Sequence, residues 1–288
     1  MVDFGIGLNL LVVVCAVIVL VMNLRTQRAV AEIVRSVEKS GPVADRWTRA
    51  ITMLAQGSQD LPATVEMRLA AIYAIEQVAC ESAVYKSPAM ELLAAYVREH
   101  ARPGKAGLEP TTEVQSVLTV LGRSAVEGLD LRRCVLWGAD LEGATLAGVN
   151  LSQGTLRGVS LAGATLVRGK LREVNLADAD LVGADLTGAN LRGAILTGAD
   201  LSGTTLKGAD FQGADLSRAR LRGADLRDAS LVGARLTAAV LDGADLTGAV
   251  LAGVDLEGAS VTGTILDAPD DFATNSRVAA VNEAAVAH

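Results

Sequence analysis

The chain has 288 residues, of which 50% are hydrophobic but only 3% are aromatic, and its net charge is −7. A core with so few aromatic rings must be built mostly from Leu, Ala and Val. Its cysteines, Cys15, Cys80 and Cys134, lie far apart and outside any Cys-x-x-Cys motif, which argues against a disulfide framework and a zinc site.

Residues 4–24 form an apolar segment in which only Asn9 and Asn23 are polar. As a helix it would be about 31 Å long, the thickness of the hydrocarbon core of a bilayer. A cleaved signal peptide would need a basic region before it, and the only early charged side chain is Asp3. We therefore expect residues 1–24 to be a retained transmembrane anchor. The basic residues all follow the segment, which places the N-terminus outside and the bulk of the chain in the cytoplasm: Arg25, Arg28, Arg35 and Lys39.

Residues 25–128 are predicted to be an α-helical region. The membrane helix is expected to continue to about Ser40, and apolar spacing predicts further helices at 43–56, 63–82, 87–101 and 112–121. Ser87 and Pro88 suit the N-cap and first position of the third of these, and Gly122 suits the C-cap of the last. Short amphipathic helices must pack together, so we expect a bundle or a HEAT-like stack that caps the following domain and separates it from the membrane.

Residues 129–268 are a run of 28 five-residue repeats. Every fifth residue from Leu131 to Leu266 is Leu, except Phe211 and Val261. Two residues before the Leu position stands Ala in most repeats; the residue before it is often Asp or Asn, and Gly usually stands two residues after it.

A period of five fits neither a straight helix nor a straight strand, because successive leucines would point in different directions. The chain must therefore turn once per repeat, with Leu and Ala inside, Asp outside and Gly at the corner, where the backbone angles are unusual. Only a solenoid whose walls stack strand on strand meets these conditions.

The repeat resembles the A(D/N)LXX pattern of the pentapeptide-repeat family, as in the segment from Ala184 to Gly188. The resemblance implies a mainly β fold, a right-handed quadrilateral β-helix with four repeats per coil and about seven coils. The helical region also looks like that of other bacterial pentapeptide-repeat proteins, which places the anchor in the bacterial inner membrane. This second resemblance rests on residues 68–76 and 114–122.

With four repeats per coil, residues twenty apart become vertical neighbours. This arrangement predicts a basic stripe on one wall, formed by Arg132, Lys170, Arg172 and Arg192, and an acidic stripe on the opposite wall, formed by Asp140, Glu142, Asp180 and Asp200. On another wall Asp215, Arg235 and Asp255 alternate in charge. These stripes are either a docking surface or ordinary solvated surface.

Apolar residues at outward positions indicate contacts with other parts of the chain or with a partner. Val135 and Trp137 lie on the first coil, where we expect them to pack against the helical region, whereas Val232 and Val250 lie near the end of the rod. The last coil is an open strand edge, which proteins normally cover. Either the C-terminal tail, residues 269–288, or a homodimer through this coil would cover it.

The chain lacks the residues of an enzyme, since it has only two histidines, His100 and His288, and no metal-ligand spacing or phosphate-binding loop. We expect no cofactor and no direct binding of nucleic acid. The favoured hypothesis is a membrane-anchored scaffold or protein–protein interaction module with an unknown protein partner. The alternative is a DNA mimic that acts on a type II topoisomerase (gyrase), as the resemblance permits. The repeats carry 13 basic and 17 acidic side chains, a net charge of −4, which is low for such a mimic.

Overall fold

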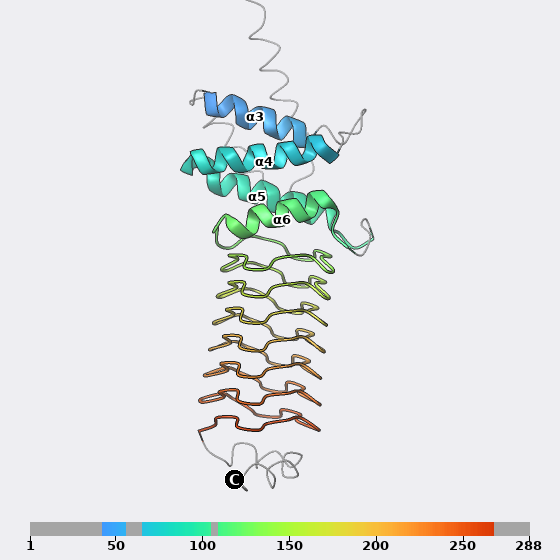
Figure 1. The fold of residues 1–288 in the computed structure, drawn as a ribbon, viewed down its shortest axis with the longest axis vertical. Helices are drawn as coiled ribbons and strands as arrows, with labels where there is room; N and C mark the ends of the chain where they lie inside the picture. Colours follow the sequence, from blue (N-terminus) through green and yellow to red (C-terminus); the bar gives the residue numbers. More distant parts are fainter. Residues whose placement is uncertain (1–41, 56–64, 105–108, 268–288) are drawn as a thin grey trace, which may run out of the picture.

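Four helices lie above a solenoid in the computed structural model, which describes residues 42–55, 65–104 and 109–267 (Figure 1). The helices are α3 (Pro42–Ala55), α4 (Val65–Glu81), α5 (Ala83–His100) and α6 (Thr112–Arg123). None of these described helices has both the length and the apolar character needed to cross a bilayer. The expected membrane segment at residues 4–24 and the C-terminal tail both lie outside the described residues.

Helices α3 and α4 form an antiparallel pair. Arg46 in the first half of α3 forms an ion pair with Glu81, the last residue of α4. The ring of Trp47 lies 5.4 Å from that of Tyr85 at the start of α5, and both side chains are buried. Farther along, the guanidinium of Arg68 on α4 lies 2.8 Å from the carboxylate of Glu113 on α6. Hydrophobic packing and these ion pairs hold the four helices together as one layered unit.

Two helix boundaries differ from those expected from sequence. Helix α5 begins at Ala83 instead of Ser87, so Pro88 lies inside the helix. Proline in that position removes one helical hydrogen bond, but burial of Tyr85 against Trp47 stabilises the preceding turn as helix. Gly122 lies within α6 and is not its C-cap. A Cβ at Gly122 would stand 2.8 Å from the Cβ of Ala144, so glycine is needed there because α6 approaches the rod closely.

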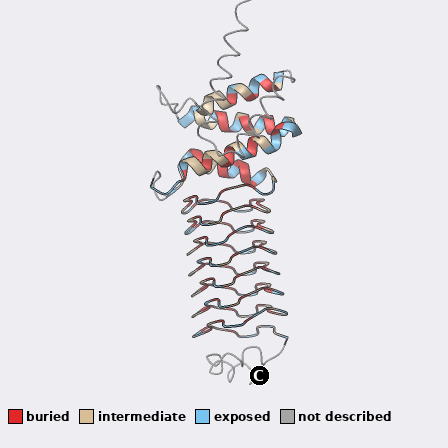
Figure 2. Ribbon diagram, turned by 180° about the vertical axis from the view of Figure 1, so that it is seen from behind, coloured by how far each residue is buried: buried red, intermediate tan, exposed pale blue. Residues whose placement is uncertain are grey.

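The repeats form a β-helix with four repeats per coil. Parallel bridges join residues twenty apart, from Asp130 with Asn150 to Asp245 with Ile265. The leucine positions and the positions two residues earlier are buried, except in the last coil, where Ala249, Thr264 and Leu266 are half-buried. Together with the helical region they form one continuous hydrophobic core. Figure 2 shows this alternation of buried and exposed residues along every coil. The expected inward and outward residues are therefore confirmed.

The corner of each described repeat has a left-handed backbone. From residue 133 to residue 263, the second residue after each Leu position has φ between 55° and 72°. Glycine adopts this conformation at little cost, which confirms its expected place at the corner. Eight corners tolerate other residues, at a cost of about 1–2 kcal/mol each: Arg133, Gln153, Arg168, Glu173, Asp178, Arg218, Asp228 and Ala238.

The helical region covers the first coil, contacting all four of its walls. The amide of Val135 donates to the carbonyl of Ala101 at 2.7 Å, and the amide of Thr145 donates to that of Gly122 at 2.6 Å. The Gln115 side chain pairs with the backbone of Asp140 in both directions, at 2.7 and 3.1 Å. On the remaining wall, Arg98 donates to the carbonyl of Asp130. Backbone groups that would otherwise form an open strand edge are thus paired with the helices.

Candidate interaction surface

The outward Asp and Asn side chains stabilise the corners of the rod. In all thirteen repeats with Asp or Asn before the Leu position, its side-chain oxygen accepts the backbone amide two residues later, at 2.9–3.3 Å. Such Asx turns satisfy the amide of the residue just before the corner, which the ladder does not use. The sequence interpretation treated these residues only as surface charge. Their regular position before Leu was the signal that could have revealed the structural role.

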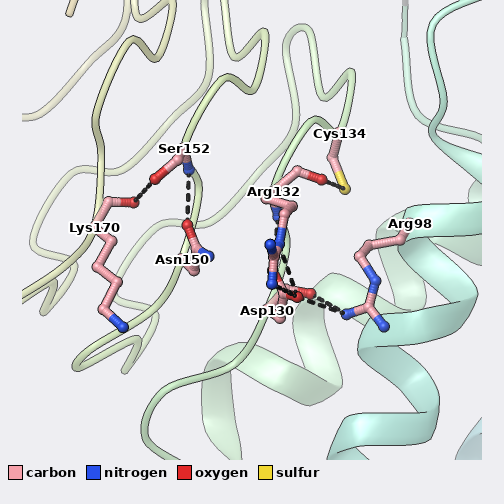
Figure 3. Close-up of polar contacts among 7 residues, drawn as sticks. All are labelled: Arg98, Asp130, Arg132, Cys134, Asn150, Ser152 and Lys170. Atoms are coloured by element: carbon pink, nitrogen blue, oxygen red, sulfur yellow. Dashed lines mark hydrogen bonds and ion pairs between the residues drawn. The ribbon is translucent and has the colours of Figure 1, made fainter. Parts of the chain in front are cut away.

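The expected basic stripe is largely neutralised by neighbouring carboxylates. Arg132 forms a two-pronged contact with Asp130, at 2.8–3.0 Å (Figure 3). Arg172 lies 3.0 Å from Glu173 and Arg192 lies 3.5 Å from Asp210, so the arginines contribute less positive potential than their number indicates. Within the described residues, only the Lys170 ammonium of the four has no carboxylate at ion-pair distance. The residues share a wall, but they do not form an uncompensated cationic track.

Asp130 lies where the rod meets α5. Burial by itself would raise the pKa of its carboxyl, but hydrogen bonds from Arg132 and the charge of Arg98 outweigh this effect and lower the pKa. The nearby Cys134 is buried, and burial raises the pKa of its thiol to about 12. Figure 3 shows both side chains beside Arg98. The cluster therefore fastens the rod to the helical region, and its thiol is too basic to act as a nucleophile near neutral pH.

The wall with Asp140, Glu142, Asp180 and Asp200 changes its charge along the rod. Asp180 and Asp200 are vertical neighbours joined by a parallel bridge. One coil below, Arg220 lies 3.5 Å from Asp200. Burial would raise the pKa of Asp200, but hydrogen bonds from Ser202 and the contact with Arg220 lower it overall. Among the residues with described positions, no acidic, histidine or cysteine cluster is suited to hold a metal ion.

Vertical pairing of opposite charges recurs on the other walls. Arg235 lies 3.1 Å from Asp215, as the alternation of charge in the sequence indicates. The stacked carboxylates of Asp225 and Asp245 are bridged by Arg227, at 2.6 and 3.8 Å. Arg227 thus offsets the repulsion between these two stacked carboxylates. These ion pairs leave a nearly balanced outer surface.

Apolar outward residues occur at both ends of the rod. Trp137 on the first coil is half-buried, and its indole N–H is buried without a hydrogen-bond partner among the described residues. At the other end, Val232 is half-buried, whereas 51% of Val250 and 54% of Ile265 are exposed. Val250 is bridged to Ser230, two residues before Val232, so the two valines lie on one wall in the last two described coils.

A family model described as Pentapeptide repeats, in eight copies, matches residues 127–163, 155–193, 170–208, 194–231 and 229–267. The chain belongs to the pentapeptide-repeat family. The repeats of this family form a right-handed β-helix, and its members are generally non-enzymatic structural or interaction proteins. A comparison with curated proteins finds no match.

Several solved structures are similar to the chain. A pentapeptide-repeat protein from the cyanobacterium Cyanothece 51142 is 38% identical over 36% of this chain and 64% of its own, just under two thirds, with a TM-score of 0.21. One from Nostoc PCC 7120 is 36% identical over 38% of this chain and 84% of its own, with a TM-score of 0.28. QnrB1, a plasmid-mediated fluoroquinolone resistance protein, is 20% identical over 55% of this chain and 88% of its own, with a TM-score of 0.23.

Proposed function

We propose that this pentapeptide-repeat protein is a non-enzymatic, membrane-anchored scaffold that presents a rigid rod to a protein partner. The observation that carries the proposal is the continuous core that runs from the helices through every described coil. Leucine and alanine side chains fill this interior, and a filled rod offers its outer walls, not a cavity, for recognition. Paired corners and ion pairs keep those walls rigid, which lowers the entropy cost of binding a partner.

The anchor in this proposal is the apolar segment of residues 4–24, followed by basic residues. The protein is then a single-pass protein of the bacterial inner membrane, with its N-terminus outside and the rod in the cytoplasm. The helical region serves as the connection, since its lower side is paired with the first coil.

The alternative function, mimicry of DNA toward gyrase, receives less support from the surface. A DNA mimic needs a dense and uncompensated row of negative charge that resembles phosphates. Here the acids at Asp200, Asp215 and Asp225 each lie beside an arginine. The supercoiling activity of gyrase, measured with increasing amounts of the protein, tests this alternative directly. Inhibition at stoichiometric concentrations would favour mimicry over the scaffold function.

Proximity labelling in intact cells tests the scaffold function and its topology. With the labelling enzyme fused after His288, we expect labelled cytoplasmic proteins in cells whose membrane fraction retains the fusion. Charge reversals at Lys170 and Arg172 test one wall, and charge reversals at Asp140 and Glu142 test the opposite wall. Only the pair on the wall that binds the partner should reduce labelling of that partner. Labelling confined to exported proteins would reverse the topology, and recovery of the fusion in the soluble fraction would exclude the anchor. The mass of the purified protein in detergent distinguishes a monomer from a homodimer through the last coil.

A further inference from the structure

Helix α4 has an apolar stripe on its outer face that the other described helices leave uncovered. The stripe continues onto the start of α5 and consists of Ala70, Tyr73, Cys80 and Val84, all exposed. Tyr73 is 49% exposed and Val84 is 64% exposed, the highest value among the large hydrophobic residues described. Spacings of three and seven residues place Ala70, Tyr73 and Cys80 on one face of α4, with the exposed Gln77 among them. Val84 follows in the first turn of α5, beyond the extended backbone of Ser82. By contrast, the exposed residues of α3 are Pro42 and charged side chains, so its outer face shows no comparable stripe.

The sequence before α3 has the complementary pattern. In residues 25–40, Val30, Ile33, Val34 and Val37 recur at the spacing of one helical face. In a helix, the basic residues of this segment would lie on the opposite face. The apolar pattern of the segment is therefore complementary to the stripe on α4.

The antiparallel arrangement of α3 and α4 brings the segment to the stripe. Contacts of Arg46 with Glu81 and of Trp47 with Tyr85 place the start of α3 beside the junction of α4 and α5. The chain therefore enters α3 close to Cys80 and Val84. A helix of residues 25–40 would be about 24 Å long and α4 is about 26 Å long, so the two match when they run in the same direction.

We infer that residues 25–40 form a helix that lies on the α4 stripe, parallel to α4. With an offset of 43 residues, Val37 faces Cys80 and Val30 faces Tyr73. The helices α3 to α6 cross the long axis of the rod (Figure 1). Residues 25–40 bound along α4 would therefore also cross the rod axis. If the membrane helix continues straight into this segment, the long axis of the rod would lie parallel to the bilayer surface. Only this last consequence rests on the proposed anchor; the docking of residues 25–40 does not.

Cross-linking of the full-length protein in detergent micelles tests the docking. The variant Val37→Cys keeps the native Cys80, and a short bismaleimide should join the two within one chain. The control Arg35→Cys places the thiol on the opposite face, and we expect it to react at least about tenfold more slowly because its effective concentration near Cys80 is lower. A second control, Val37→Cys with Cys80→Ser, should give no such product. Equal yields for positions 35 and 37 would overturn the inference, as would a product of twice the mass, in which a second copy occupies the stripe.

Limited digestion with trypsin provides a test without new cysteines. Docking should slow cleavage after Arg28, Arg35 and Lys39, and Tyr73→Asp should accelerate it because a carboxylate disrupts the apolar contact. Tyr73 is half-exposed, so this substitution leaves the helical core intact. Equal cleavage rates in the two proteins would contradict docking. Slow cleavage only in vesicles, unaffected by Tyr73→Asp, would instead place the segment on the lipid surface. Cell fractionation tests the membrane anchor separately, so the anchor and the docking of residues 25–40 can each be refuted without the other.

Discussion

Gln115 has an unusual part in the structure, because one side chain takes the place of a β-strand above the first coil. Its amide nitrogen donates to the carbonyl of Asp140 at 2.7 Å, and its carbonyl accepts the amide of Asp140 at 3.1 Å. We predict that Gln115→Ala destabilises the protein by about 1–2 kcal/mol. Two hydrogen bonds contribute about 0.5–1.5 kcal/mol each, and the lower half of this range applies because Asp140 is exposed and water replaces part of the loss.

Urea denaturation followed by circular dichroism measures this change, and hydrogen exchange of the Asp140 amide locates it. The matched control is Thr119→Ala, since the Thr119 hydroxyl donates to the carbonyl of Gln115 within α6 and, among the described residues, makes no contact with the rod. Gln115→Glu should restore little stability at neutral pH, because a carboxylate accepts from the amide of Asp140 but repels its carbonyl. If Gln115→Ala left both the urea midpoint and the exchange rate at their original values, the idea that this side chain caps the coil would be wrong.

Three further outcomes follow from the packing and the charges. Gly122→Ala should destabilise the protein by about 1–3 kcal/mol, because the new Cβ meets Ala144 at 2.8 Å, and Ala144→Gly in the same chain should recover part of the loss in thermal melts. Asp185→Ala should cost about 0.5–1.5 kcal/mol by removing the acceptor of the Thr187 amide, whereas Asp185→Asn keeps that acceptor and should cost less in urea titrations. Hydrogen bonds from Arg227 lower the pKa of Asp225, so its contribution to stability is present above the unfolded pKa of about 3.9 and is lost as the pH falls through the lower folded value. Asp225→Asn should therefore make the urea midpoint less dependent on pH below about 4, and an unchanged pH profile would contradict this assignment.

The period of the repeat is enough to predict the rod. Five-residue spacing of Leu, with Ala two residues before it and Gly two residues after it, admits only a chain that turns once per repeat. The number of four repeats per coil came from the family resemblance, and the bridges between residues twenty apart confirm it. Local sequence determines this part because each repeat makes the same contacts with the coils above and below. The approximate positions of the four described helices also follow from apolar spacing.

Contacts between distant parts of the chain decided the remaining features. The sequence predicts a helix start at Pro88, but the burial of Tyr85 extends α5 back to Ala83. It predicts a helix end at Gly122, but this glycine lies within α6, close to Ala144. Charges that form stripes in the sequence become ion pairs in the structure, since Arg192 reaches Asp210 and Arg220 reaches Asp200. Periodicity describes where each Cβ points, but the length of a side chain and the neighbour it reaches depend on the packed structure. For this reason the sequence determined the solenoid, whereas only the tertiary structure decided how its first coil is capped and how its surface charges are paired.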